Sequence, residues 1–137
     1  MIAKYNTQIN IDGKNYPIID AEAQKNLVYS QNEIDTGKIW IDGKKIYRKV
    51  VNCGYLLKDD TLVVKHNIEN INKIIKVNGI GYQDGGDCLP IPYIYNAPQG
   101  QGSISLYANK TNIVMVTYGD RTDVRVLITL EYTKTTN

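Results

Sequence analysis

The stretch that decides the fold of this chain is Lys38-Ile-Trp-Ile-Asp-Gly-Lys-Lys-Ile-Tyr-Arg-Lys-Val-Val51. Two runs that alternate apolar and polar residues flank Asp42-Gly43. This pattern predicts a β-hairpin closed by a type I′ turn, because both central residues of that turn need a positive φ. A two-residue loop fixes the register, which pairs Ile41 with Lys44, Trp40 with Lys45 and Ile39 with Ile46. One face would carry Ile39, Ile41 and Ile46, and the other Trp40, Lys45 and Tyr47, a set suited to cation–π contact.

A second hairpin signal lies near the N-terminus, around Asp12-Gly13. The same register rule pairs Ile9 with Tyr16 and Ile11 with Lys14. A weak apolar stripe over residues 20–31 predicts one short helix, with Asp20 as its cap. We therefore divide the chain into an N-terminal appendage of hairpin plus short helix, residues 1–35, and a main domain, residues 36–137.

The main domain is expected to be built from strands. Residues 52–60 are predicted to form a loop, and residues 89–95 an edge strand or extended segment, because Pro90 and Pro92 cannot donate to a ladder. Further strands are predicted over residues 61–65, 73–82, 103–108, 112–118 and 124–133. The last strand places Val124, Val126, Ile128, Leu130 and Tyr132 on one face. Regularly spaced strands and dense turns predict an all-β fold, an antiparallel β-sandwich of Greek-key or jelly-roll type.

Charge and hydropathy argue against two classes of partner. The net charge is +2 and is spread along the chain without a Lys/Arg block, so we expect no nucleic-acid binding. No apolar run approaches the ~18 residues of a membrane span, so we expect no membrane insertion. The N-terminus lacks an apolar signal core, which predicts that synthesis finishes in a cytoplasm. Cys53 and Cys88 match no zinc spacing and are expected to be free thiols.

Residues for catalysis are few. The single histidine, His66, would have to serve any nucleophilic triad, yet it lies in a polar turn and is expected to be solvated or to cap backbone groups. Asp59-Asp60 and the pair Asp84 and Asp87 could suggest glycoside hydrolysis or calcium binding, but acids in turns are usually turn formers. We therefore predict no enzyme activity, no metal site and no cofactor.

Two loop stretches carry aromatic and polar side chains together, in a chain with eleven Tyr, one Trp and no Phe. Flat aromatic faces beside acid, amide and guanidinium groups suit a sugar-binding site. Turn residues and strand-edge tyrosines would explain the same pattern without a ligand. The predicted ligand-binding residues are Tyr93, Tyr95, Asn96, Tyr118, Asp120 and Arg121.

Residues 38–51 resemble the "K-W-I-D-G-K-P-I-Y-R-K" opening of a domain found at the C-termini of tail fibre and baseplate receptor-binding proteins. These proteins belong to phages of Gram-positive bacteria and to related phage-tail-like bacteriocins. The similarity continues through residues 66–77, 89–93, 105–107 and 130–136, and covers about residues 36–137. Lys45 stands where proline is common in the family. Such fibres usually carry long N-terminal shafts, so the resemblance leads us to expect either a small tail protein or a separately encoded tip.

The resemblance implies a β-sandwich head, a homotrimer, and a non-catalytic role in attaching to the host surface. The implied partners are host cell-wall polysaccharide or teichoic acid and other phage tail or baseplate proteins. The implied location is the tail of the virion, after assembly in the bacterial cytoplasm. The residues also favour trimerisation, because Val114, Val116 and Leu127 oppose the main apolar faces of their strands and need a second cover, either the other sheet or a neighbouring subunit.

Two other functions stay open at this point. The first is a stand-alone carbohydrate-binding module or lectin, which we expect to be monomeric or dimeric. The second is a glycan-degrading enzyme that uses pairs of aspartates. The family supplies no binding residues that could be carried over to this chain, so the six predicted residues depend on the sequence pattern alone.

Overall fold

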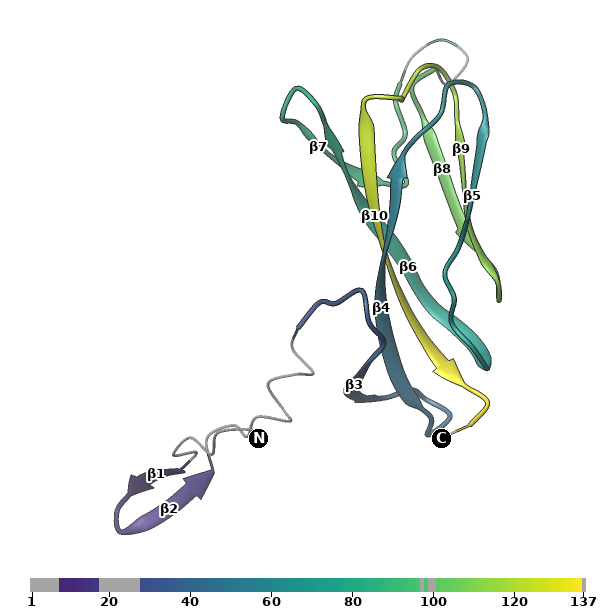
Figure 1. Ribbon diagram of the computed structural model, residues 1–137. Coiled ribbons are helices and arrows are strands. Elements are labelled where there is room, and N and C mark those ends of the chain that lie inside the picture. The colour runs from purple at the N-terminus through teal and green to yellow at the C-terminus, as the bar shows by residue number, and fades with distance from the viewer. Residues whose placement is uncertain (1–7, 18–27, 97, 99–100, 137) are drawn as a thin grey trace.

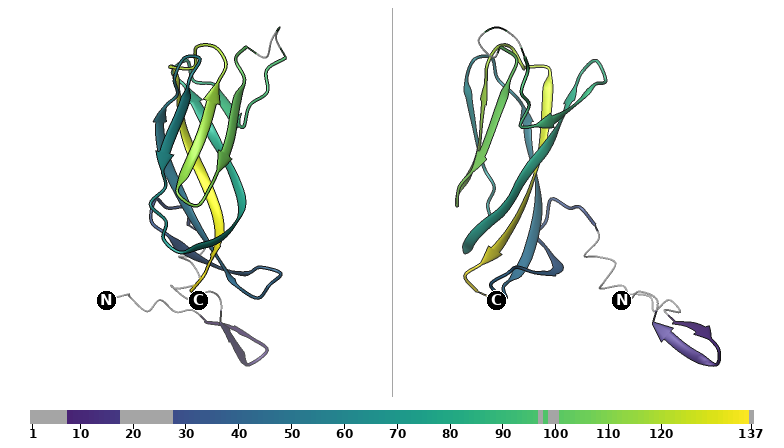
Figure 2. Two further views of the ribbon diagram at one scale, coloured as in Figure 1. Left: turned by 90° about the vertical axis from the view of Figure 1, so that its right-hand side faces the viewer. Right: turned by 180° about the vertical axis from the view of Figure 1, so that it is seen from behind.

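A computed structural model describes residues 8–17, 28–96, 98 and 101–136 of the chain. Within this part the structure contains ten strands, all paired antiparallel, and no α-helix. A five-stranded and a three-stranded sheet pack face to face (Figures 1 and 2), which confirms the predicted all-β sandwich. Residues 20–27 of the predicted helix lie outside the described residues, and residues 28–31 are not helical.

The sheets are assembled from strands distant in sequence. The larger sheet has the order β3 (Ile34–Ile39), β4 (Lys45–Tyr55), β10 (Val124–Lys134), β6 (Ile71–Gln83) and β7 (Cys88–Ile91). The smaller has the order β5 (Thr61–Lys65), β9 (Asn112–Thr117) and β8 (Ile104–Ala108). A separate pair joins β1 (Gln8–Ile11) and β2 (Lys14–Pro17). The C-terminal strand β10 lies between β4 and β6, so the topology is not a plain meander, as expected.

The N-terminal hairpin has the predicted turn and register. Asp12 (φ 51°) and Gly13 (φ 76°) both adopt the left-handed conformation, as a type I′ turn requires. The register pairs Ile9 with Tyr16 and Ile11 with Lys14.

The second hairpin, between β3 and β4, differs from the prediction. Trp40 N donates to Lys44 O at 2.8 Å and Gly43 N donates to Trp40 O at 2.9 Å, which closes a three-residue loop. In this loop Gly43 has a positive φ of 84° and Asp42 does not, the signature of a type I turn followed by a G1 bulge. The register is therefore Ile39 opposite Lys45, one residue away from the predicted pairing with Ile46.

This shift overturns the predicted faces of the hairpin, because a one-residue slip moves a side chain to the other side of a strand. Ile46 is buried, whereas Ile39 is 60% and Ile41 92% exposed. The cation–π contact predicted for the set of Trp40, Lys45 and Tyr47 is also replaced. The Nζ atom of Lys134 lies 5.3 Å from the centroid of the Tyr47 ring, and Lys45 instead forms a salt bridge to Asp35 at 3.6 Å.

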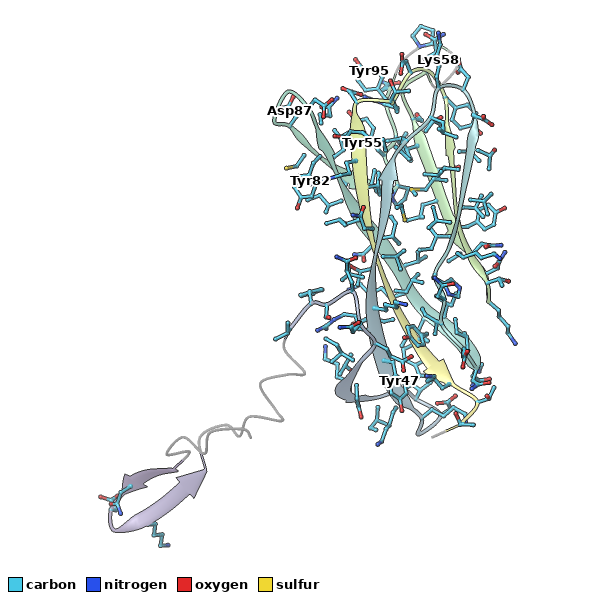
Figure 3. The ribbon with its side chains drawn as sticks, in the orientation of Figure 1. Tyr47, Tyr55, Lys58, Tyr82, Asp87 and Tyr95 are labelled. Atoms are coloured by element: carbon cyan, nitrogen blue, oxygen red, sulfur yellow. The ribbon has the colours of Figure 1, made fainter. Side chains whose placement is uncertain are left out.

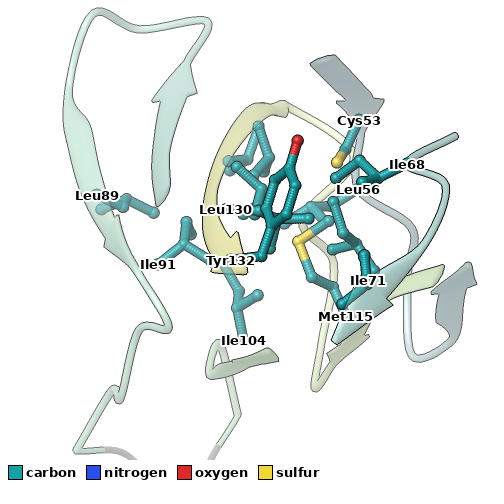
Figure 4. Packing of buried hydrophobic residues seen from close by; sticks show 14 residues of the cluster. Cys53, Leu56, Ile68, Ile71, Leu89, Ile91, Ile104, Met115, Leu130 and Tyr132 are labelled. Atoms are coloured by element: carbon teal, nitrogen blue, oxygen red, sulfur yellow. The ribbon is translucent and has the colours of Figure 1, made fainter. Parts of the chain in front are cut away.

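The core is organised around β10. The five residues predicted to share its inner face are all fully buried, namely Val124, Val126, Ile128, Leu130 and Tyr132. Ile113 and Met115 of β9 pack against them from the smaller sheet, and Figure 4 shows Met115 beside Leu130 and Tyr132. On β6, Gly79 lies opposite Ile128 so closely that a Cβ atom there would come within 2.5 Å of the Leu127 carbonyl oxygen. Glycine thus permits the close approach of β6 and β10.

One local prediction was wrong in part, and another is decided between its two alternatives. Residues 52–55 are not a loop but continue β4, because a bulge at Cys53 and a left-handed Gly54 (φ 72°) keep the strand paired with β10. His66 is not solvated: it is buried, its Nε2 lies 2.9 Å from Asn109 O, and its Nδ1 accepts a 3.2 Å hydrogen bond from Ile68 N. This histidine satisfies backbone groups of two connections, which agrees with the capping alternative.

Candidate functional site

Four connections gather at one end of the sandwich, which we call the loop pole. They join β4 to β5 (residues 56–60), β6 to β7 (84–87), β7 to β8 (described at 92–96, 98 and 101–103) and β9 to β10 (118–123). Figure 3 shows Lys58, Tyr95 and Asp87 at this end and Tyr47 near the other. Antiparallel strands alternate in direction, so connections from distant parts of the chain meet here.

The loop pole holds a pocket of about 700 Å³. Its walls come from all of these connections except residues 84–87, together with the facing ends of β6 and β7. The lining residues are Lys58, Asp59, Gln83, Leu89, Tyr93, Tyr95, Gln101, Gly102, Gly119, Asp120 and Arg121.

Backbone contacts fix the loops around the pocket. Gly102 N donates to Tyr118 O, and Tyr118 N donates to Ser103 O at 3.0 Å. Asp59 N donates to Gly119 O at 2.9 Å, and Asp59 Oδ1 accepts from Gly119 N at 2.6 Å. Gly102 has a φ of 91°, and a Cβ atom there would lie 3.0 Å from Arg121 Nη2. The left-handed φ favours glycine at this position, and an added Cβ atom would in addition press against the Arg121 guanidinium.

Arg121 is held in one place by two neighbours, Gly102 and Tyr93. Its Nε and Nη2 donate to Gly102 O at 2.8 and 2.6 Å. Its guanidinium carbon lies 5.4 Å from the centroid of the Tyr93 ring, a cation–π contact. Tyr93 in turn stacks on Tyr95, with ring centroids 6.2 Å apart and an interplanar angle of 26°. These bonds do not use Nη1, so a pre-positioned guanidinium edge is offered to a ligand.

Two carboxylates complete the polar wall. Asp120 Oδ1 accepts hydrogen bonds from Thr122 Oγ1 at 2.7 Å and Thr122 N at 3.0 Å. These bonds, with a smaller contribution from nearby Lys58, lower the pKa of Asp120. Asp59 is tied to Gly119 N through its Oδ1. Each side chain keeps a second oxygen outside these bonds, and such an oxygen can accept a hydrogen bond from a hydroxyl group.

This combination of groups suits a ligand rich in hydroxyls. The stacked tyrosines offer aromatic surface, the carboxylates and Gln101 accept hydrogen bonds, and Lys58 and Arg121 donate them. Among the described residues there is no group of three or more His, Cys, Asp or Glu that could hold a metal ion. That part of the chain also lacks a helix able to cross a membrane.

Four of the six predicted binding residues line the pocket, namely Tyr93, Tyr95, Asp120 and Arg121. Asn96 is exposed on the same loop without lining the pocket, and Tyr118 is 48% exposed and contributes only backbone bonds to the wall. Lys58 and Gln83 were missed, and Asp59 was interpreted only as half of an acidic pair. Nothing local marks Lys58 or Asp59, because they reach residues 119–121 only through folding.

No model of a protein family matches this chain, and searches of curated proteins and of solved structures returned no match. The function is therefore inferred from the site itself and from the resemblance of residues 38–51.

Proposed function

We propose that this protein is a non-catalytic receptor-binding protein of a phage tail, which attaches as a homotrimer to glycan on the surface of a Gram-positive host. The observation that carries the proposal is the pocket at the loop pole, where the Tyr93–Tyr95 stack lies beside a fixed Arg121 and two carboxylates. The resemblance of residues 38–51 to tail fibre and baseplate proteins supplies the biological setting, with attachment to other tail proteins and a location in the virion.

The placement of the chain supports this role. Residues 28–30 run beside β4, since Val50 N donates to Ser30 O at 2.9 Å and Arg48 Nη2 donates to Val28 O at 2.8 Å. The β3–β4 turn and the end of β10 lie opposite the loop pole (Figure 1). In this proposal the loop pole faces the host, and the opposite end is the side left for the tail.

Outer sheet faces support the trimer. Leu127 and Ile80 are paired neighbours on the face of the larger sheet turned away from the core, beside a hollow of about 350 Å³. On the smaller sheet, Val63 and Tyr107 are 56% and 55% exposed and flank Val114 in the register. Lys76 and Glu131 also line the hollow of the larger sheet, and a neighbouring subunit would cover these polar groups together with the apolar ones.

The binding site is tested by sedimentation of the protein with purified Gram-positive cell walls. Tyr95 is half-exposed in the pocket, so Tyr95→Ala should weaken retention by about tenfold or more without unfolding the domain. The control is Ile41→Ala, which removes a 92% exposed side chain at the opposite end and should leave retention unchanged. Equal retention of wild type and Tyr95→Ala would remove the pocket from the binding site.

The stand-alone carbohydrate-binding module is separated from this proposal by the mass in solution. Light scattering should give about three times the chain mass of 15.5 kDa for a tail protein. A monomer with undiminished wall binding would favour the stand-alone module. Loss of glycan mass during incubation, abolished by Asp120→Asn, would instead favour a hydrolase.

A further inference from the structure

The loop pole has a charge opposite to that of the whole chain. Its connections carry two cations, Lys58 and Arg121, and six carboxylates, so the pole has a net charge of −4 whereas the chain has +2. The connection over residues 92–103 contains no charged side chain. The carboxylates are Asp59, Asp60, Asp84, Asp87, Asp120 and Asp123.

These carboxylates are at the surface of the loop pole. All are exposed except Asp123, which is half-buried and accepts a 3.5 Å hydrogen bond from Gln83 Nε2. Backbone bonds hold their loops together, since Asp84 N donates to Asp123 O at 3.1 Å. Within the described residues, no ion pair joins Lys58 or Arg121 to any of the six. The pole therefore presents a negative field that its own cations do not cancel.

We infer that the ligand of the loop pole is an uncharged wall polysaccharide and not a polyanionic teichoic acid, an inference that depends on the proposed function. A chain of polyol phosphates carries a negative charge on every repeat. The Debye length is about 8 Å at physiological ionic strength, so phosphates lying in the pocket would feel several of the carboxylates at once. Nε and Nη2 of Arg121 are bonded to Gly102 O, so Arg121 can offer a phosphate only its Nη1 edge. Lys58 is the other cation of the pocket, and these two cations face the six carboxylates of the loop pole.

An uncharged sugar chain meets no such repulsion. Its hydroxyl groups can donate to the outer oxygens of Asp59 and Asp120, and its apolar ring faces can lie on Tyr95. Asp59 and Asp120, two of the six carboxylates that repel a polyphosphate, are thus also acceptors for a neutral polysaccharide. The same charges provide both affinity and discrimination between wall polymers.

The test is competition for retention on walls of a strain that binds the wild-type protein. Two soluble competitors are used at equal mass: poly(glycerol phosphate), and the phosphate-free polysaccharide fraction separated from the same walls by anion exchange. We expect the phosphate-free fraction to release the protein and poly(glycerol phosphate) to leave it bound. Release by poly(glycerol phosphate) would overturn the inference while leaving wall attachment intact. Absence of wild-type retention on any wall would instead overturn the proposed function, and this inference with it.

A charge reversal makes the test independent of the native ligand. Asp84 and Asp87 lie outside the pocket lining, so Asp84→Lys/Asp87→Lys brings the pole to neutrality without touching the pocket. This variant should bind poly(glycerol phosphate) at least about tenfold more tightly than wild type, and more so at low salt. The control Asp42→Lys/Glu69→Lys makes the same change at the other end and should gain nothing. An unchanged affinity of the Asp84/Asp87 variant would refute charge as the basis of exclusion.

Discussion

The contact between β6 and β10 gives a sharp prediction for Gly79→Ala. The added Cβ atom would lie 2.5 Å from the carbonyl oxygen of Leu127 and 2.4 Å from Cδ1 of Ile128. The Ile128 side chain could rotate, but the carbonyl belongs to the hydrogen-bonded backbone of a central strand, so relief requires the two strands to separate. The backbone at Gly79 is not in the left-handed region, so the whole cost comes from crowding.

The expected loss follows from that geometry. Overpacking a core costs about 1–3 kcal/mol, and a clash with backbone belongs at the upper end, so we expect about 3 kcal/mol. With a urea m-value of about 2 kcal/mol/M, the midpoint of unfolding should fall by about 1.5 M. The closest atom to a Cβ at Gly81 is a side-chain atom, Cγ1 of Val124 at 2.7 Å, so Gly81→Ala should cost about 1–2 kcal/mol.

The assay is urea unfolding followed by circular dichroism, with all variants at one protein concentration because assembly would shift the midpoint. Gly85→Ala is the matched control, since nothing lies within 4 Å of its added Cβ and its φ is not positive. Its free energy of unfolding should stay within about 0.5 kcal/mol of wild type. A midpoint for Gly79→Ala equal to that of Gly85→Ala would show that β6 and β10 do not approach as closely as described.

Three further predictions use other parts of the sandwich. Burial raises the pKa of the Cys53 thiol to about 11, whereas Cys88 is exposed. Iodoacetamide should therefore label Cys88 in the native protein and Cys53 only after unfolding, as measured by peptide mass spectrometry. Equal rates of labelling of the two thiols in the native protein would contradict the burial of Cys53. Tyr132→Phe removes the 2.6 Å hydrogen bond from the buried hydroxyl to Glu33 Oε1 and should lower the free energy of unfolding in urea by about 1.5–3 kcal/mol. An unchanged midpoint would show that the bond adds no stability. The pKa of Asp120 is lowered from 3.8, so the contribution of this carboxylate to stability is present above pH 3.8 and disappears as the pH falls through the folded value. The urea midpoint of wild type should therefore exceed that of Asp120→Asn at neutral pH and converge with it in acid. A difference between the two midpoints that widens in acid would contradict a lowered pKa.

The alternation of apolar and polar residues was sufficient to predict the long regular strands. The alternation from Val124 to Tyr132 placed those side chains in the core because a strand turns successive residues to opposite faces whatever its neighbours are. It could not predict that Asn52 and Gly54 continue β4, since both residues favour turns and only pairing with β10 stabilises the bulge. Part of the pocket could be predicted, because the sequence itself shows which loops are rich in Tyr, Asp and Arg. Lys58 and Gln83 could not be predicted, because they join Arg121 in the pocket lining only through folding.

The two Asp-Gly hairpins separate what the sequence by itself determined from what the tertiary structure decided. The same Ile-x-Ile-Asp-Gly-Lys pattern marked both turns correctly as hairpins, because Asp and Gly tolerate the conformations that tight turns need. Yet Asp12-Gly13 forms a type I′ turn and Ile41-Asp42-Gly43 a type I turn with a G1 bulge. Either turn satisfies the local backbone, so long-range packing selects the register. Ile46 and Arg48 of β4 are buried, which fixes the side of the sheet that each residue of β4 faces. β3 pairs with β4 in the register that keeps this orientation, with Ile39 opposite Lys45.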